Sequence, residues 1–188
     1  QADAPDRAWV SDVACVKINK NYLYICVILD LFSRKVVAHR VSPKNSAYLI
    51  TSMFRQAFQR RNAPRSLVFH SDQGAQYTSK AFRKLLRMNK VANLFPDPDS
   101  LMTTLLWSPS FIHEVEEIYR TQYGSERQFV KSVDDYVEFY NIQRPHSTLN
   151  YKTPAQFEAI HESQKRLRDN SDKGVQNWSF SRFRLRIS

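Results

Sequence analysis

The sequence predicts an α/β fold in which helices flank a mixed β-sheet. Three strand-like runs come first, at residues 9–18, 22–32 and 35–41, and each is rich in β-branched and aromatic residues. An amphipathic segment, a short apolar strand at residues 66–72 and a second amphipathic segment follow. An antiparallel meander followed by alternating elements is typical of an α/β layer fold with a mixed sheet.

Turn-forming residues separate the three strand-like runs. Asn19-Lys20-Asn21 lies between the first and the second run, and Ser33-Arg34 lies between the second and the third. Short connections of this kind join antiparallel neighbours, so we expect a three-stranded meander.

Three segments have the period of an amphipathic helix. The first has Ser46 as its candidate N-cap, the second has Ser79, and the third runs from Ser125. Their expected buried faces are, in chain order, Tyr48, Leu49, Ser52, Met53, Gln56 and Ala57; Phe82, Leu85 and Leu86; and Phe129, Val133, Tyr136 and Tyr140.

The charge balance favours a polyanionic partner. The 188 residues include 28 Lys and Arg against 18 Asp and Glu, a net charge of +10. Nucleic acid is the first candidate and an anionic membrane surface the second. No apolar run approaches the ~18 residues of a membrane span, and no signal peptide is present, so we expect no membrane partner and a cytoplasmic, nucleoid-associated protein.

Cysteine and glycine usage restricts the kinds of site that we expect in this protein. Cys15 and Cys26 both lie in apolar strand-like runs, which favours two buried free thiols over a disulfide or a metal pair. The three glycines are too few for a glycine-rich phosphate loop. The chain begins at Gln1 rather than Met, so we expect a fragment of a longer protein.

Two aspartates are the candidate metal ligands. Asp12 interrupts an apolar strand, where an unpaired carboxylate is costly, and Asp72 lies where the strand at 66–72 ends. Carboxylates on neighbouring strands can hold Mg²⁺, which prefers oxygen ligands. Alternatively, Asp12 pairs with a nearby Lys or Arg and Asp72 only caps a turn. Residues 55–90 contain nine Lys and Arg and one acid, Asp72, which favours a metal site beside a phosphate backbone.

Several motifs resemble one known family. HSDQGAQYTS at 70–79 resembles the second-aspartate motif of the DDE transposases and retroviral-type integrases. WVSDV is similar to their first-aspartate strand, and VILDLFSRKVVAHRVS to the two strands that follow. YVEFYNIQRPHSTLNYKTPAQFE at 136–158 resembles the end of the integrase core in bacterial insertion-sequence transposases. The resemblance spans roughly residues 9–158.

The resemblance implies a fold and an activity. The fold would be the three-layer, ribonuclease H-like fold with a mixed five-stranded sheet. The activity would be DNA cleavage and strand transfer, with Asp12 and Asp72 as ligands of Mg²⁺ or Mn²⁺. Implied partners are the transposon ends, the target DNA and further copies of the chain, and a DNA-binding segment upstream of residue 1 would be missing. Residues 1–160 would form the catalytic core, and 161–188 a basic, poorly ordered tail.

The chain departs from this family at the third acid. The family carries a glutamate on a helix after Asp72, within a string close to S-R-x-G-x-x-H-D-N-A-V-V-E-S-F-F. Its usual spacing falls on Trp107–Ser108, and nothing in residues 94–113 matches the string. We therefore expect the region of the fifth strand and of this helix to be disrupted.

Codon arithmetic suggests a reason for the departure. In the alternate reading frame, each codon joins the third base of one printed residue to the first two bases of the next. In this frame Met102-Thr103 can give only aspartate. Trp107-Ser108 gives glutamate when the serine codon begins AG. The intervening pairs allow Asn-Ala-Val-Val, and residues 108–111 allow Ser-Phe-Phe. We hypothesise that residues ~94–113 are translated out of frame between two compensating insertions, deletions or sequencing errors. The alternative is coincidence helped by codon degeneracy.

Another acid could occupy the missing position. Glu114, Glu116 and Glu117 follow the return to the native frame, and Glu114 is the candidate substitute. It lies about two helical turns beyond the expected position, on the order of 9–15 Å along a helix, and Pro109 disfavours a continuous helix. The alternative is that these are solvated helix acids. We therefore expect a transposase that is weakened or inactive as written.

Basic residues supply the candidate DNA contacts. They are Lys80, Arg83, Lys84, Arg87, Arg144 and His146. For Arg144 and His146 a role in fixing the loop around Pro145 is equally open. His70 could orient Asp72 or contact a phosphate, or be an ordinary strand histidine, and Asp30 could be structural at the Ser33-Arg34 turn.

Two other functions compete with an active transposase. One is a non-catalytic DNA-binding remnant, which would bind DNA in a salt-dependent manner without cutting it. The other is a ribonuclease H-type hydrolase of the same fold, which the string YN-x-x-R-P-H disfavours because it points to transposition.

Overall fold

The computed structural model describes residues 2–94 and 121–181, with side chains as far as Asn170. The elements in chain order are β1 (Ala8–Ile18), β2 (Asn21–Asp30), β3 (Val36–Ser42), α1 (Ala47–Arg60), β4 (Val68–Ser71), α2 (Ala75–Thr78), α3 (Lys80–Met88), β5 (Ala92–Leu94), α6 (Glu126–Ile142), the 3₁₀ turn η1 (Ser147–Leu149) and α7 (Pro154–Ser181).

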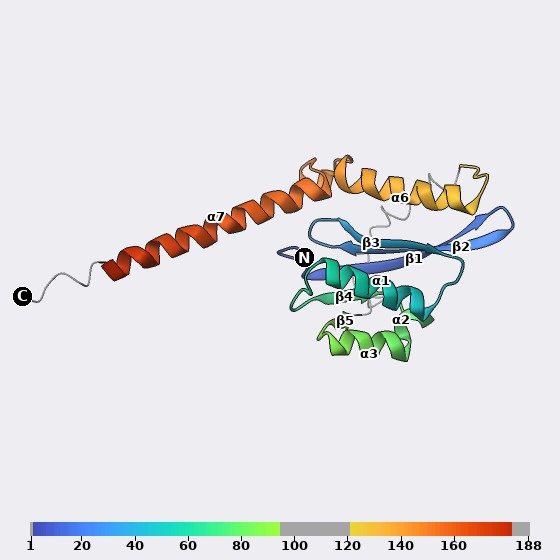
Figure 1. The fold of residues 1–188 in the computed structure, drawn as a ribbon, viewed down its shortest axis with the longest axis horizontal. Helices are drawn as coiled ribbons and strands as arrows, with labels where there is room; N and C mark the ends of the chain where they lie inside the picture. Colours follow the sequence, from blue (N-terminus) through green and yellow to red (C-terminus); the bar gives the residue numbers. More distant parts are fainter. Residues whose placement is uncertain (1, 95–120, 182–188) are drawn as a thin grey trace, which may run out of the picture.

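The five strands form one mixed sheet, as predicted. Their order is β3-β2-β1-β4-β5 (Figure 1). The β1–β2 and β2–β3 pairs are antiparallel, whereas β1–β4 and β4–β5 are parallel. The predicted meander is therefore confirmed, and β4 lies beside β1 through a crossover that includes α1. The fifth strand is only three residues long.

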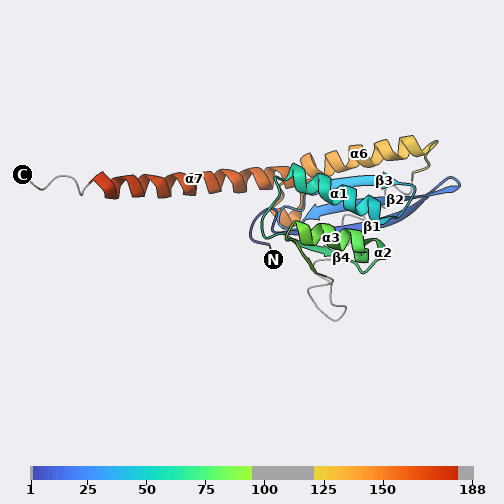
Figure 2. The same ribbon diagram turned by 60° about the horizontal axis from the view of Figure 1, so that its bottom comes forward.

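Helices cover the two faces of the sheet to give three layers. On one face α1 and α3 pack over a cluster that includes Trp9, Phe54 and Phe82. On the other face α6 packs over Val16, Ile25 and other residues of the first three strands. Figures 1 and 2 both show the sheet between these two helical layers.

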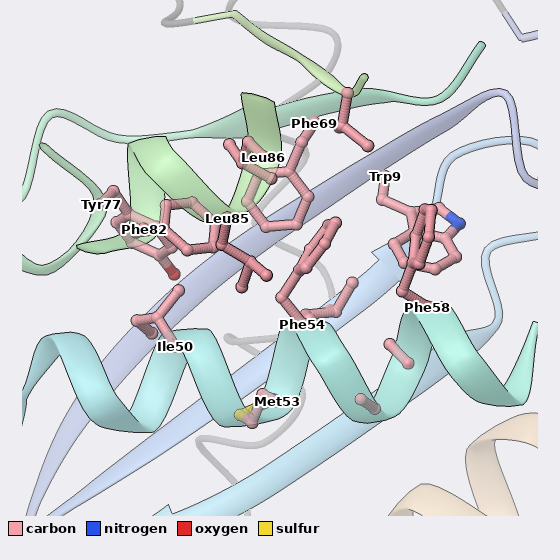
Figure 3. Packing of buried hydrophobic residues seen from close by; sticks show 14 of the residues in the cluster. Trp9, Ile50, Met53, Phe54, Phe58, Phe69, Tyr77, Phe82, Leu85 and Leu86 are labelled. Carbon is pink, nitrogen blue, oxygen red and sulfur yellow. The ribbon is translucent and has the colours of Figure 1, made fainter. Parts of the chain in front are cut away.

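The core under α1 is aromatic. Phe54 lies at its centre, with ring centroids 5.4 Å from Phe69, 5.9 Å from Phe82 and 6.2 Å from Trp9, all in edge-on arrangements (Figure 3). Such pairs contribute about 0.5–1.5 kcal/mol each beyond the burial of their surface. This cluster fixes β1 and β4, the two strands that carry the candidate site.

The buried face of α1 is one residue later than predicted. The predicted cap Ser46 is confirmed, since its hydroxyl accepts a hydrogen bond from the Leu49 amide at 3.3 Å. Tyr48 is 77% exposed, and the buried face consists of Leu49, Ile50, Met53, Phe54, Ala57 and Phe58. The helix rotates this way because it buries two phenylalanines and an isoleucine in place of a tyrosine, a serine and a glutamine.

The other two amphipathic helices follow the prediction closely. α3 is capped by Ser79 and buries Phe82, Leu85 and Leu86. In α6 the fully buried residues include Val137, while Tyr136 is only half-buried. Both differ from the sequence expectation by no more than one position.

The C-terminal segment differs from the predicted tail. Residues 161–181 continue α7 as one helix of 28 residues, which projects away from the sheet (Figure 1). Its start is a capping box: the Gln156 amide donates to the Thr153 hydroxyl at 3.2 Å, and the Thr153 amide donates to the Gln156 side chain at 3.1 Å. Pro154 occupies the first helical position, and no proline or glycine follows before Gly174.

The two cysteines are both free, but only Cys26 is buried. Cys15 is exposed, so the prediction of two buried thiols is wrong for it. It pairs with Tyr24 of β2, close to the turn of the β1–β2 hairpin. In the described part of the chain, no helix has the length and apolar character needed to cross a membrane.

Candidate functional site

The sheet places Asp12 and Asp72 on neighbouring strands. β1 and β4 run parallel, and their last paired residues are Ser11 and Ser71. Asp12 and Asp72 are the next residues on the two strands, so they occupy facing positions. By the alternation of strand side chains, Asp12 shares its face with Val10 and Val16, the face that α6 covers elsewhere.

The charges of the two carboxylates affect each other. Burial raises the pKa of Asp12 above its ordinary value, a hydrogen bond from the Val13 amide at 2.7 Å opposes this shift, and the charge of Asp72 raises the pKa further. Two carboxylates that repel each other in a half-buried position are the arrangement that a divalent cation relieves.

The turn after β4 fixes Asp72. The Gly74 amide donates to Asp72 Oδ1 at 2.9 Å, which closes an Asx turn. A Cβ atom at position 74 would lie 2.9 Å from Asp72 Oδ1 and 2.5 Å from the end of the Gln76 side chain. A side chain at this position would therefore have to displace the Asp72 carboxylate and the end of the Gln76 side chain.

A buried hydrogen bond joins the two aspartate segments from below. Tyr77 and Ser11 are 0% and 1% exposed, and their hydroxyl oxygens are 2.8 Å apart. Ser11 Oγ also donates to the Val27 carbonyl at 2.8 Å, so Tyr77 Oη is the donor to Ser11. Because Ser11 precedes Asp12 and Tyr77 belongs to the segment after Asp72, this pair holds the strand and the turn in register.

These residues fit a hard divalent cation. Asp12 and Asp72 offer only oxygen ligands, and each has a single backbone amide as its described hydrogen-bond partner. Within residues 2–94 and 121–170, no group of three His, Cys, Asp or Glu side chains is arranged so that it could hold a metal ion. Glu114 and the expected third-acid position at Trp107 and Ser108 lie outside the described residues.

His70 is the titratable neighbour of this pair. It is paired across the sheet with Val10, which places it on the face of Asp12, and it is half-buried. Burial lowers the pKa of its imidazole. A neutral imidazole on this face can accept or donate a hydrogen bond beside the carboxylates.

The four basic residues predicted on α3 lie elsewhere. Lys80, Arg83, Lys84 and Arg87 are all exposed on the outer side of α3. The buried side of α3 packs with α1, so the sheet separates these four residues from the face that carries Asp12 (Figure 1). The structure therefore does not bring them to the carboxylate pair.

Arg144 and His146 are built into the loop after α6. Arg144 donates to the Tyr136 hydroxyl at 3.0 Å. The His146 ring packs edge-on against Tyr140, 4.6 Å between centroids, and its backbone pairs with Lys152. These contacts favour the loop-fixing alternative for both residues.

Six side chains form an ion-pair cluster that the sequence did not reveal, and we call this cluster the clamp. Its members are Asp6, Asp30, Ser33, Lys35, Arg61 and Glu158. Arg61 donates to both oxygens of Glu158, at 2.8 and 3.1 Å, and its Nε contacts Asp6 at 2.7 Å. Lys35 and Ser33 also donate to Glu158, each at 2.8 Å.

Asp30 has the structural role at the Ser33-Arg34 turn that the sequence suggested. It is fully buried and accepts hydrogen bonds from the amides of Phe32, Ser33 and Asp6 and from the Ser33 hydroxyl. Burial raises its pKa, although these hydrogen bonds oppose the shift. The only advance sign of the clamp was an acid at the end of an apolar strand.

Two family models match the chain, both described as integrase core domain. One matches residues 2–100 and the other residues 111–161. Residues 101–110 lie between the two matches.

Curated relatives are transposases. The transposase for insertion sequence element IS904 of Lactococcus lactis is 30% identical over 168 residues, covering 84% of this chain and 63% of the relative. Transposase InsF for insertion sequence IS3A of Escherichia coli is 29% identical over 160 residues, covering 84% of this chain and 55% of the relative. The chain thus spans 55–63% of the length of these relatives.

Solved integrase cores share the fold. The catalytic core domain of BIV integrase superposes with a TM-score of 0.65 at 19% identity, covering 86% of this chain and 99% of that chain. The HTLV-2 integrase catalytic core domain in complex with magnesium gives 0.62 at 17% identity, covering 84% of this chain and 99% of that chain. The ribonuclease H-like, three-layer fold class is therefore confirmed.

Proposed function

Because this chain belongs to the integrase core domain family, we propose that it is the core of a DDE-type insertion-sequence transposase that has lost its third catalytic carboxylate. The observation that carries the proposal is the facing placement of Asp12 and Asp72 on parallel strands. The transposase relatives support DNA as the substrate.

The mechanism assigns a role to each residue of the pair. Asp12 and Asp72 would supply the oxygen ligands for Mg²⁺ or Mn²⁺, oriented by the Val13 and Gly74 amides. When bound, such ions activate the attacking oxygen and stabilise the leaving oxygen of a phosphodiester. Tyr77 and Ser11 would keep the ligands in register, and His70 would contact the substrate phosphate or orient Asp72.

The missing glutamate would limit this chemistry. Both family models leave residues 101–110 unmatched, which supports the hypothesis that a segment near ~94–113 is read out of frame. If the third ligand contributes ~4 kcal/mol to the transition state, its loss reduces the rate about a thousandfold. Glu114 is the proposed substitute if any activity survives.

Further parts of the proposal concern partners. Transposition would use several copies of the chain on paired DNA ends in the bacterial cytoplasm, with a DNA-binding segment outside the printed sequence. The exposed cations of α3 would contact DNA away from the cleavage site, because the sheet separates them from Asp12.

A Mn²⁺-dependent nicking and strand-transfer assay on plasmid DNA tests the proposal. The chain as printed is compared with a version in which residues 94–113 are replaced by the offset-frame motif, and with Asp12→Asn in that repaired version. We expect activity only in the repaired chain with Asp12 intact. Equal activity in the printed and repaired chains would show that another acid completes the site, and activity that survives Asp12→Asn would reject the site.

A non-catalytic DNA-binding remnant is the second candidate. It is favoured by the net charge of +10 and by the lack of an acid in the sequence at the expected third position, Trp107–Ser108. Salt-dependent DNA binding by a repaired chain that still does not nick would select this function.

A further inference from the structure

A second charged site lies at the N-terminal end of β1, before the strand reaches Asp12. It is a cleft of about 350 Å³ between the segment before β1, the loop between α1 and β4, and the start of α7. Its charged lining residues are Asp6, Arg7, Arg65, His161, Glu162 and Lys165, and the rest are alanine and proline.

The acids of the cleft are already paired. Asp6 accepts two contacts from Arg61 Nε, at 2.7 and 3.0 Å, and a hydrogen bond from Trp9. Glu162 lies 4.0 Å from Arg166, one turn further along α7. Neither carboxylate therefore forms an ion pair with a basic side chain that lines the cleft.

The cations of the cleft are uncommitted. Within the described residues, Arg7, Arg65 and Lys165 form no ion pair with any acid, and all three are exposed. His161 has its ring 4.9 Å from that of Phe32, which fixes it at the cleft wall. Three separate elements thus converge with an excess of positive charge, which attracts an anion.

The loop that carries Arg65 is held in an unusual backbone conformation. Asn62, Ala63 and Ser66 have φ values of 57°, 50° and 60°, in the left-handed region that residues with side chains rarely adopt. Asp6, on the other side of the cleft, has φ 62°. These conformations fix the course of the loop and with it the position of the Arg65 backbone.

We propose that this cleft binds phosphate groups of a nucleic-acid backbone through Arg7, Arg65 and Lys165. The identity of the nucleic acid as DNA rests on the proposed function. The cleft lies about five strand residues from Asp12, or ~16 Å along β1, so its phosphates are distinct from the one that is cleaved. Exposed cations on separate elements suit an extended, repeating anion because each can meet a different phosphate.

Equilibrium binding of a fluorescent DNA duplex at about 50 to about 200 mM salt tests the proposal. One variant carries Arg7→Gln, Arg65→Gln and Lys165→Gln. A matched control carries Arg55→Gln, Arg127→Gln and Lys20→Gln, which removes the same charge from exposed sites elsewhere. We expect the cleft variant to lose about one unit of salt slope for each phosphate contact removed, and the control to keep the slope of the parent chain.

The outcomes separate this proposal from the proposed function. Equal slopes for the cleft variant and the control would overturn the cleft, while DNA binding itself would stand. No DNA binding by the parent chain would count against the proposed function instead. Calorimetry with inorganic phosphate and with ATP tests whether the cleft binds free phosphate compounds instead of a nucleic-acid backbone. ATP binding in the cleft without any effect on DNA affinity would reject the proposal that the cleft binds the backbone. Equal melting temperatures establish that both variants are folded.

Discussion

Glu158 joins parts of the chain that are far apart in sequence. Its carboxylate is 6% exposed and accepts hydrogen bonds from Arg61, Lys35 and Ser33. Burial alone would raise its pKa, but these hydrogen bonds and charges lower the pKa overall below the ordinary value of 4.5. The folded state therefore binds fewer protons at this site than the unfolded state does.

We predict that Glu158→Gln destabilises the fold by about 3 kcal/mol at pH 7, because it leaves a buried guanidinium with one fewer anion. The contribution of Glu158 is fully present above pH 4.5 and is lost as the pH falls through its lower folded-state pKa. Denaturant unfolding across this pH range measures the difference between parent and variant. Glu162→Gln, in an exposed pair on the same helix, is the control and should change stability by less than about 0.5 kcal/mol. If the difference in unfolding free energy between parent and variant stayed constant as the pH falls, the stabilising role of ionised Glu158 would be contradicted.

At the residue scale, the sequence singled out Asp12 and Asp72 as candidate ligands but gave no sign of the long-range contacts that hold the fold together. A carboxylate at a strand position or a strand end breaks a local pattern, so each aspartate stands out. Arg61 and Glu158 are 97 residues apart, and neither breaks any local period. The same is true of Asn141, whose side chain pairs with the Val36 backbone at 2.9 and 3.0 Å on the edge strand β3.

At the element scale, α7 divides into an attached part and an exposed part. Phe157 and His161 contact Phe32, whereas residues 162–170 are all exposed. Figures 1 and 2 show the helix projecting from the body beyond this point.

We predict that a chain ending at Lys165 keeps the stability of the full sequence to within about 0.5 kcal/mol, because it retains the clamp and removes only the projecting helix. A chain ending at Thr153 loses Phe157 and Glu158 and should be destabilised by more than about 3 kcal/mol. Thermal and denaturant unfolding of the two chains test this. Equal losses for both truncations would mean that the projecting part is packed in solution.

Helix starts were predictable where a hydroxyl residue precedes an amphipathic run, as at Ser46 and Ser79. The start of α7 had a comparable pattern, Thr153-Pro154-Ala155-Gln156, which is a capping box. The rest of α7 was not predicted to be helical because its composition is polar. An exposed helix has no apolar stripe, so it lacks the amphipathic period that indicates a helix.

At the scale of the whole molecule, the projecting helix makes the shape anisotropic. α7 has 28 residues, so it is ~42 Å long. A compact chain of 188 residues has a radius of gyration of ~16 Å.

We predict a radius of gyration clearly above ~16 Å for the monomer in small-angle X-ray scattering. The chain ending at Lys165 is the control and should fall close to the compact value for its length. Equal compactness of both chains would show that α7 folds back onto the body.

The meander and the mixed sheet followed from the order of the elements, and the five-stranded, ribonuclease H-like arrangement followed from the family resemblance. The third-carboxylate region did not follow, because residues 94–113 have no periodic pattern from which to infer an element.

The clamp also sets the order in which this protein can finish folding on the ribosome. Ser33 and Arg61 emerge early in synthesis, but their partner Glu158 is 125 and 97 residues later in the chain. Until residue 158 has been synthesised, Arg61 can pair with Asp6 but lacks its second anion, Glu158. We therefore expect a chain that stops short of residue 158 to be more open to proteases than one that contains it.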